Sequence, residues 1–248
     1  MATNLGVALC KAGHEVTAVY SRTMQSAEAL ATTIGSSPTN DISHLPLQAD
    51  VFIVSVKDDA LQTLIPQLAK GREDQLFVHT AGSMTLSVFE GIMQRYGVFY
   101  PMQSFSTERR VDFAEIPVFI EASDNPTLER IRLLAETISQ SVYVLSSEER
   151  KYLHLAAVFA CNFANHCYTL AARVLEEHGL PFSVMLPLID ETARKVHQLH
   201  PKEAQTGPAI RYDENVISMQ SQLLRDHPEM KEIYERMSQS IHKTATDT

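Results

Sequence analysis

The stretch "MATNLGVALCKAGHEVTAVYSRT", residues 1–23, decides the fold class of this chain. Its first half carries apolar residues at helical spacing, namely Leu5, Ala8, Leu9 and Ala12. Gly13 suits the end of that helix, and residues 14–22 form an apolar, β-branched run of strand type. Helix, glycine and strand make the second half of a βαβ unit, so the strand that opens the unit is expected upstream of Met1.

Strands and helices continue to alternate up to about residue 146. Residues 49–56 ("ADVFIVSV") are a continuous apolar run, which is typical of a strand buried on both faces of a parallel sheet. Further strands are expected within residues 75–83, 96–106, 116–123 and 141–147. Helices are expected within residues 23–34, 57–70 and 126–140. This alternation predicts a doubly wound α/β domain with a parallel sheet over residues 1–146.

The rest of the chain, residues 147–248, is expected to form an all-α domain. Residues 146–179 begin with serines and glutamates and end in Gly179, which predicts one long capped helix. Further helices are expected over residues 181–199, 214–225 and 228–241.

Composition and charge limit the kinds of molecule that the protein is expected to bind. The formal net charge of −9 argues against a nucleic-acid partner, because such binding needs clustered Lys and Arg side chains, so a small-molecule ligand is expected. Three cysteines, Cys10, Cys161 and Cys167, are too few for a disulfide framework and indicate a reduced, cytoplasmic protein. No spacing typical of a metal site occurs in the sequence. Residues 153–175 are apolar but contain His, Asn and Arg, which favours a helix buried in protein over a membrane span.

The segment after the first strand indicates a cofactor. In dinucleotide-binding folds an acidic residue there binds the ribose 2′-hydroxyl, and a basic residue accommodates a 2′-phosphate. This chain has Ser21, Arg22 and Thr23 and no carboxylate, which favours NADP; the alternative is a surface arginine at a helix start. Met1 and Ala2 fall at the last two positions of the G-x-G-x-x-G/A fingerprint, so its phosphate-binding turn is also expected upstream of Met1.

Other strand ends supply further candidates, since ligands of doubly wound sheets bind beyond the carboxyl ends of the strands. The candidates for cofactor contacts are Val56, Lys57, His79 and Thr80. His79 either contacts the ligand or is hydrogen-bonded within its loop. The candidates for substrate contacts are Gln103, Ser104 and Arg211, although Arg211 has a salt bridge to Asp213 as its alternative.

Several segments together resemble one family. They are "NLGVALCKAGHEVTAVYSRT", "VHTAGSMTLSVFEG", "YPMQSFS", "HLAAVFACNFANHCYTLA", "LPLIDETARKV" and "QTGPAIRYDENV". As a set they resemble NADP oxidoreductases that join a Rossmann-like domain to an uncharacterised helical domain, relatives of pyrroline-5-carboxylate reductase and the β-hydroxyacid dehydrogenases. The resemblance implies an NADP-binding amino-terminal domain and a helical domain that supplies homodimer contacts and part of the active cleft.

The proton donor of the β-hydroxyacid dehydrogenases does not carry over. That group has a Lys and an Asn one turn apart, whereas here the residue one turn before Asn162 is Val158. Lys151 lies about 16 Å from Asn162 along a helix, too far to share a substrate atom. Asn162 and His166 are one turn apart and are the candidates for holding a carbonyl or hydroxyl group over the nicotinamide; core or interface hydrogen bonding is the alternative.

The sequence therefore predicts an NADP-dependent oxidoreductase that transfers hydride to or from a small carbonyl, imine or hydroxyl compound. The alternative is an NADP-binding sensor or scaffold without catalysis. A homodimer formed through the helical domain is expected, because a long helix that is apolar all round needs cover on more than one side.

Overall fold

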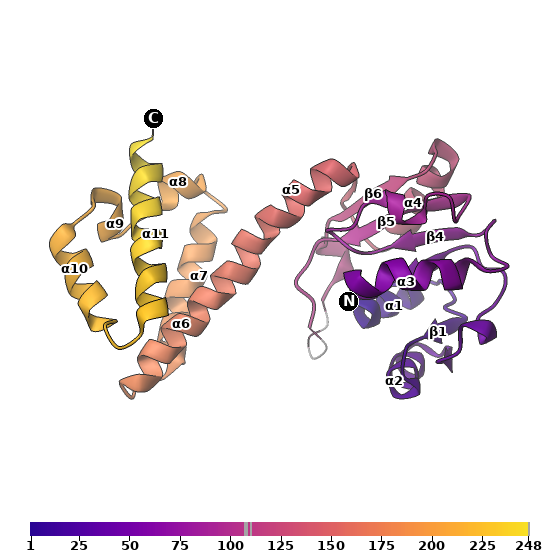
Figure 1. The fold of residues 1–248 in the computed structure, drawn as a ribbon, viewed down its shortest axis with the longest axis horizontal. Helices are drawn as coiled ribbons and strands as arrows, with labels where there is room; N and C mark the ends of the chain where they lie inside the picture. The colour runs from indigo at the N-terminus through magenta and orange to yellow at the C-terminus, as the bar shows by residue number, and fades with distance from the viewer. Residues whose placement is uncertain (107–108, 110, 248) are drawn as a thin grey trace. The chain divides into compact units, whose positions relative to one another are not determined.

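The structure, a computed structural model, describes residues 1–106, 109 and 111–247 of the chain. It has two compact units, Met1–Cys161 and Asn162–Thr248. Figure 1 colours the chain from the N-terminus to the C-terminus and labels many of its helices and strands. The sequence-based boundary at residue 146 coincides with the N-cap of helix α5, and the units divide later, within a π-helical turn.

The first unit contains two groups of strands. β1 (Ala18–Tyr20) pairs with β2 (Ser37–Thr39), and a five-stranded sheet has the order β3-β4-β5-β6-β7. The five strands are β3 (Phe52–Val54), β4 (Leu76–His79), β5 (Arg95–Pro101), β6 (Val118–Ala122) and β7 (Val142–Val144). The predicted α/β class is confirmed, since every pair except one is parallel.

One strand pair is antiparallel and so differs from the parallel sheet that the sequence predicts. β6 runs antiparallel to β5, with Gly97 opposite Ala122 and Pro101 opposite Val118. The described part of the connection between them holds only the short helix η3 (Phe113–Glu115). A parallel neighbour needs a crossover, usually a full helix, so β6 pairs in the opposite direction.

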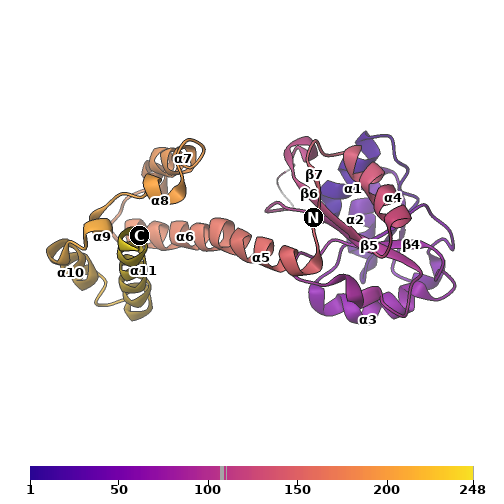
Figure 2. The same cartoon turned by 90° about the horizontal axis from the view of Figure 1, so that it is seen from above.

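Helices cover both faces of the five-stranded sheet (Figure 2). On one face α1 (Ala2–Lys11) and α4 (Asn125–Glu136) bury Leu5 and Ile131 against Val78. On the other face α3 (Asp58–Ala69) packs against Phe77. Adjacent residues of β4 thus belong to opposite core clusters, as the two-residue period of a strand requires.

A cavity of about 720 Å³ separates β1 from β3. Side chains of α1 and both strands line it, among them Leu5, Val19 and Ile53. Among the described residues, β1 pairs only with β2 and β3 only with β4, so both edges that face the cavity are open. In the standard doubly wound order, 3-2-1-4-5-6, a strand lies between the two that correspond to β1 and β3.

The helical run that follows β7 begins as the sequence predicts. Ser146 caps α5 (Ser147–Ala157), and Glu149 completes a capping box with it. The predicted single helix is interrupted, however, by a π-helical segment, Val158–Phe163, before α6 (Ala164–Glu177). Single π-helical turns within α-helices are frequent at functional sites.

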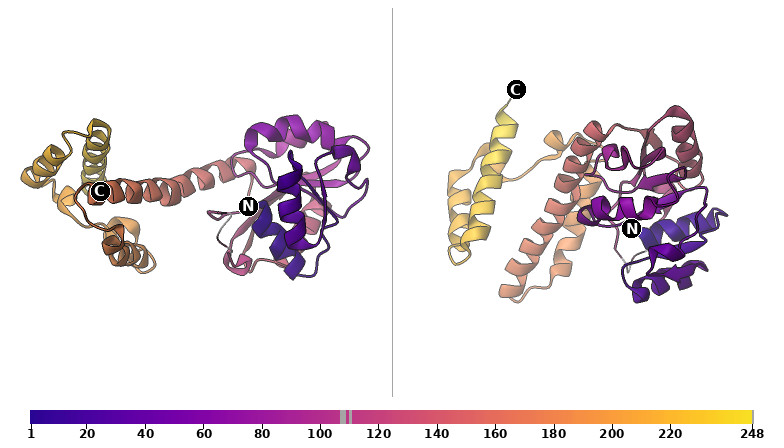
Figure 3. Two further views of the ribbon diagram at one scale, coloured as in Figure 1. Left: turned by 90° about the horizontal axis from the view of Figure 1, so that it is seen from below. Right: turned by 45° about the vertical axis from the view of Figure 1, so that its right-hand side comes forward.

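The second unit is helical and sparsely packed. After α6 it contains η5 (Phe182–Met185), α7 (Leu186–Lys195), α8 (Pro201–Ala204), α9 (Pro208–Arg211), α10 (Glu214–Leu223) and α11 (Pro228–Thr246). α10 and α11 lie side by side (Figure 3), where Ser221 Oγ donates to Glu235 at 2.5 Å and Tyr234 Oη to Gln220 at 2.7 Å. In contrast, α6 and α7 have no buried residue. Over the described residues, no helix combines the length and apolar character that crossing a membrane requires.

Candidate functional site

The carboxyl ends of β3, β4 and β5 lie at one edge of the sheet, because these strands run parallel. The start of α1 lies at the same edge, since Ser55 Oγ, just after β3, is 3.9 Å from Met1 Sδ. The buried Asn4 side chain donates to the Ser106 carbonyl at 3.3 Å and accepts from the Val111 amide at 3.4 Å. The loops after β3 and β5 therefore meet the first turn of α1, where doubly wound folds bind their ligands.

The predicted 2′-phosphate contacts follow β1. The Ser21 amide donates to the Thr39 carbonyl at 3.1 Å, and Thr23 caps α2 (Met24–Ile34) by accepting from the Ser26 amide at 3.4 Å. Arg22 between them is exposed. Hydrogen bonds thus hold the backbone on both sides of Arg22, whose exposed guanidinium lies at a helix N-terminus. This arrangement suits the binding of a phosphate group.

Two candidate cofactor residues open helix α3. Val56 and Lys57 are exposed, and Lys57 is the N-cap residue. Ser83, in the loop after β4, donates a hydrogen bond to the carboxylate of Asp58. The Thr80 amide donates to the Val54 carbonyl at 3.3 Å, and Thr80 itself is buried. These bonds join the loop after β4 to the end of β3 and the start of α3.

His79 is held within its loop, the second of the two alternatives that the sequence leaves open. It is fully buried at 0% exposure; its Nδ1 accepts from the Ala81 amide at 3.2 Å, and its Nε2 lies 3.3 Å from the Thr85 carbonyl oxygen. Burial, and secondly the positive charge of Arg150, lower the pKa of His79 to about 4. The imidazole is therefore neutral at pH 7 and shapes the loop rather than presenting a surface to a ligand.

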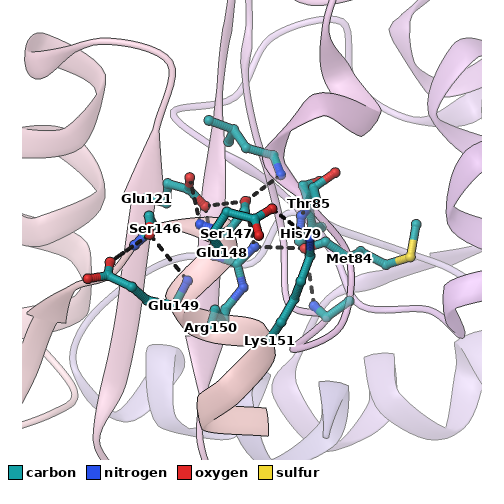
Figure 4. A network of polar contacts seen from close by, with 12 residues as sticks. His79, Met84, Thr85, Glu121, Ser146, Ser147, Glu148, Glu149, Arg150 and Lys151 are labelled. Atoms are coloured by element: carbon teal, nitrogen blue, oxygen red, sulfur yellow. Dashed lines mark hydrogen bonds and ion pairs between the residues drawn. The ribbon is translucent and has the colours of Figure 1, made fainter. Parts of the chain in front are cut away.

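A buried ion pair connects this loop to α5 and β6 (Figure 4). Arg150, only 1% exposed, donates from Nη1 to Glu121 at 2.7 Å and from Nη2 to the Met84 carbonyl at 2.7 Å. Ser147 Oγ donates to the same Glu121 carboxylate at 2.7 Å and accepts from the Leu86 amide at 2.9 Å. Sequence reasoning missed this network, because the serines and glutamates there indicate only a helix start.

Tyr100 and His154 form a second pair of neighbouring side chains. His154 lies on α5, one helical turn after Arg150, and Tyr100 lies on β5. Tyr100 Oη is 3.2 Å from His154 Nδ1, and the two rings meet edge to face at 6.2 Å. The loop after β4 touches both side chains, since a Cβ on Gly82 would lie 2.6 Å from His154 Nδ1 and 2.8 Å from Tyr100 Cζ. The only sequence signals were Tyr100 at a strand end and a histidine in an otherwise apolar helix.

The candidate substrate residues divide between the two units. Gln103 and Ser104 are exposed in the loop after β5, where Gln103 Oε1 accepts from the Ser104 amide at 2.8 Å. Asn162, at the end of the π-helical segment, and His166 in α6 are exposed residues of the second unit.

Arg211, the last residue of α9, is also exposed, and Asp213 caps α10. Within the part of the chain that the structure describes, no three His, Cys, Asp or Glu side chains are placed to hold a metal ion.

Two families match the chain. The family of Rossmann-like domains matches residues 1–102, and the family described as a domain of unknown function, DUF2520, matches residues 116–241. No curated protein sequence matches the chain significantly.

Solved structures match it over almost its full length. A Bacteroides fragilis protein named as an NADP oxidoreductase is 54% identical, with a TM-score of 0.94 over 98% of this chain and 94% of that chain. An imine reductase from Myxococcus stipitatus in complex with NADP+ is 17% identical, with a TM-score of 0.66 over 98% and 89%. A pyrroline-5-carboxylate reductase from Coxiella burnetii is 16% identical, with a TM-score of 0.59 over 100% and 95%. The last two show likeness of fold alone.

Proposed function

The chain belongs to the family that joins a Rossmann-like domain to the DUF2520 domain, and from this premise we propose that it is an NADP-dependent oxidoreductase. The observation that carries the proposal is the exposed Arg22, which follows β1 at the start of α2, with no carboxylate among residues 20–27 of the sequence. A guanidinium at this position suits the 2′-phosphate that distinguishes NADP from NAD. The 54% identity to a protein named as an NADP oxidoreductase supports the same cofactor.

The sheet edge supplies the remaining contacts to the cofactor. Ser21 and Thr23 flank Arg22, while Val56 and Lys57 lie at the end of β3 near the start of α1. The hydrogen bond from the Thr80 amide to the Val54 carbonyl fixes the loop after β4. His79 supports the same loop as a neutral, buried side chain. When bound, the nicotinamide supplies the hydride, and these residues hold it in place.

We infer that the substrate is a small compound with a C=N or C=O bond, or the corresponding amine or alcohol. Two of the similar folds are named as an imine reductase and a pyrroline-5-carboxylate reductase, which makes C=N reduction the first reaction to test. In the first unit Gln103 and Ser104 are the proposed substrate contacts. In the second unit Arg211 is proposed as a further substrate contact, and Asn162 and His166 are proposed as catalytic residues that hold the reacting carbonyl, imine or hydroxyl group. The π-helical segment at Asn162 is typical of a functional position.

We propose further that the second unit forms a homodimer. Its residues 180–199, which include η5 and α7, expose large apolar side chains, namely Leu180, Val184, Leu186, Leu188, Val196 and Leu199. α6 and α7 contain no fully buried residue, and an exposed apolar surface of this kind needs a partner to exclude water.

The experiment that tests the proposed function measures NADPH oxidation by the purified chain with a panel of cyclic imines, ketones and aldehydes. Each substrate is also tested with NADH. Turnover that requires NADPH supports the proposal. Tight NADPH binding without turnover on any substrate would favour the non-catalytic sensor, and the absence of NADPH binding would contradict both.

A further inference from the structure

We propose that Tyr100 and His154 are the proton-donating pair of this oxidoreductase, with Tyr100 as the catalytic acid and His154 as the group that reprotonates it. The inference rests on the proposed function, which identifies the reaction class but assigns no acid. Reduction of a C=N or C=O bond needs a proton as well as a hydride, and Lys151 and Asn162 do not reproduce the donor pattern of the β-hydroxyacid dehydrogenases.

The position of Tyr100 meets the first requirement of a catalytic acid. It is the next-to-last residue of β5, at the sheet edge where ligands of doubly wound folds bind. Its side chain and that of His154 are both half-buried, so the pair is neither sealed in the core nor fully hydrated. Tyr100 Oη and His154 Nδ1 are 3.2 Å apart, within reach of direct proton transfer.

Gly82 indicates why the loop after β4 approaches the pair so closely. A Cβ at this position would overlap His154 Nδ1 at 2.6 Å and the Tyr100 ring at 2.8 and 2.9 Å. Only glycine lets the backbone lie directly against both rings. The loop that carries the proposed cofactor contact Thr80 is thereby in contact with the proposed acid, which brings cofactor and proton donor to one place.

A rigid support holds His154. Arg150 lies four residues earlier on α5, on the same helix face, and its ion pair with Glu121 fastens the helix to β6. The Met84 carbonyl accepts from the same guanidinium, which fastens the helix to the loop after β4 as well. Arg150 and Glu121 are therefore positioning residues that set where His154 meets Tyr100.

The electrostatic surroundings keep the phenol protonated. Burial raises the pKa of Tyr100, while the nearby Arg150 charge acts in the opposite direction and Cys161 raises it slightly. His79, beneath the same loop, is neutral at pH 7. The phenol therefore holds its proton at pH 7, and the positive charge of Arg150 favours the phenolate that forms when the proton passes to the substrate.

The reduction adds one hydride and one proton to the substrate. Bound NADPH would supply the hydride, which forms a C–H bond at the carbon of the C=N or C=O group. The π electron pair moves to the nitrogen or oxygen, which takes the proton from Tyr100 Oη. His154 gives its Nδ1 proton to the phenolate as its Nε2 takes one from a hydronium ion of the solvent, so the imidazole stays neutral, and proton exchange with water then returns the proton from Nε2 to Nδ1. The products are NADP+ and an amine or alcohol.

A pair of substrates separates proton donation from a structural role. A neutral cyclic imine needs the acid when it is assayed at a pH at which it is unprotonated, whereas the N-methylated iminium salt of the same ring needs only the hydride. We expect Tyr100→Phe to lower kcat for the neutral imine roughly 100- to 10,000-fold and to leave reduction of the iminium salt within about threefold of wild type. His154→Gln should show the same selectivity with a smaller loss.

Tyr143→Phe is the matched control, since Tyr143 stacks on Phe119 in the same aromatic row but is exposed. It should reduce both substrates at the wild-type rate. Equal losses on both substrates for Tyr100→Phe, or no loss on either, would overturn the assignment. If the wild-type chain reduces neither substrate although it binds NADPH, the proposed function fails first, and that result is distinct from a selective loss in the variants.

Discussion

Arg150 Nη1 and Glu121 Oε2 lie 2.7 Å apart in an ion pair whose guanidinium is almost completely buried. The pair joins α5 to β6, and through the Met84 carbonyl it also holds the loop after β4. One interaction therefore fixes three of the elements that form the candidate site. The contribution of this ion pair to the free energy of unfolding and its effect on the candidate site can be measured separately.

Substitution of either residue of this ion pair should lower the stability of the protein. Glu121→Ala leaves the Arg150 charge buried without its carboxylate and should lower the free energy of unfolding by about 3 kcal/mol or more. Glu148→Ala is the control, because the Glu148 pair with Lys151 is largely exposed and should change it by less than about 1 kcal/mol. Urea denaturation measures both; equal effects would show that the buried pair has no special role.

His79 should make stability depend on pH. Its pKa falls from 6.5 to about 4 on folding, so between these values the unfolded chain binds more protons than the folded one. Stability from this group is therefore complete above about pH 6.5 and is lost as the pH falls toward 4, by about 3 kcal/mol in total.

The variant His79→Gln keeps an acceptor and a donor in the side chain but removes the titration. We expect the loss of stability between pH 6.5 and 4 to be smaller in this variant than in wild type. The exposed His197→Gln should retain the wild-type pH dependence. Identical profiles for wild type and His79→Gln would contradict the assignment of a neutral, buried imidazole.

Two glycines should respond oppositely to alanine. At Gly97 a Cβ would lie 2.3 Å from Ile131 Cδ1 and 2.5 Å from the Glu121 carbonyl oxygen, so Gly97→Ala should destabilise the protein by about 1–3 kcal/mol or more. At Gly6, inside α1, the nearest atom is 3.4 Å away, and Gly6→Ala should be neutral or stabilising by up to about 1 kcal/mol. Thermal unfolding of both variants checks this, and similar shifts in Tm would contradict it.

The apolar surface of the second unit should hold a dimer together. We expect the chain to sediment as a dimer and the double variant Leu180→Glu, Leu188→Glu to shift it toward monomer, because charges at these exposed apolar positions would be buried without partners. Glu191→Gln, on the same helix as Leu188, is the control and should leave the sedimentation unchanged. A wild-type chain that sediments as a monomer would contradict the proposal.

Local sequence patterns predicted much of the fold. The helix before Gly13, the β-branched strand after it and the helix within residues 23–34 are as the spacing of apolar residues indicates. The family resemblance carried by the quoted segments is confirmed by both family matches. These features depend on residues that are close together in the chain, so local patterns in the sequence are enough to predict them.

Long-range features were not predictable from the same patterns. An antiparallel β6 has the same alternation as a parallel one, so its direction depends on a connection that no period encodes. The π-helical turn lies within an unbroken apolar helical pattern. Arg150 and Glu121 are 29 residues apart, and neither has a local sequence signal that points to the other.

Calorimetric titration of the chain with NADPH and NADH in parallel, repeated for Arg22→Glu, tests whether Arg22 binds the 2′-phosphate. Loss of a charge-assisted contact to the 2′-phosphate should weaken NADPH binding about 10- to 100-fold and leave NADH binding nearly unchanged. Lys11→Glu, an equal charge change at the exposed end of α1, should alter neither. Equal losses of both cofactors in Arg22→Glu, or a wild-type chain that does not prefer NADPH, would contradict the account.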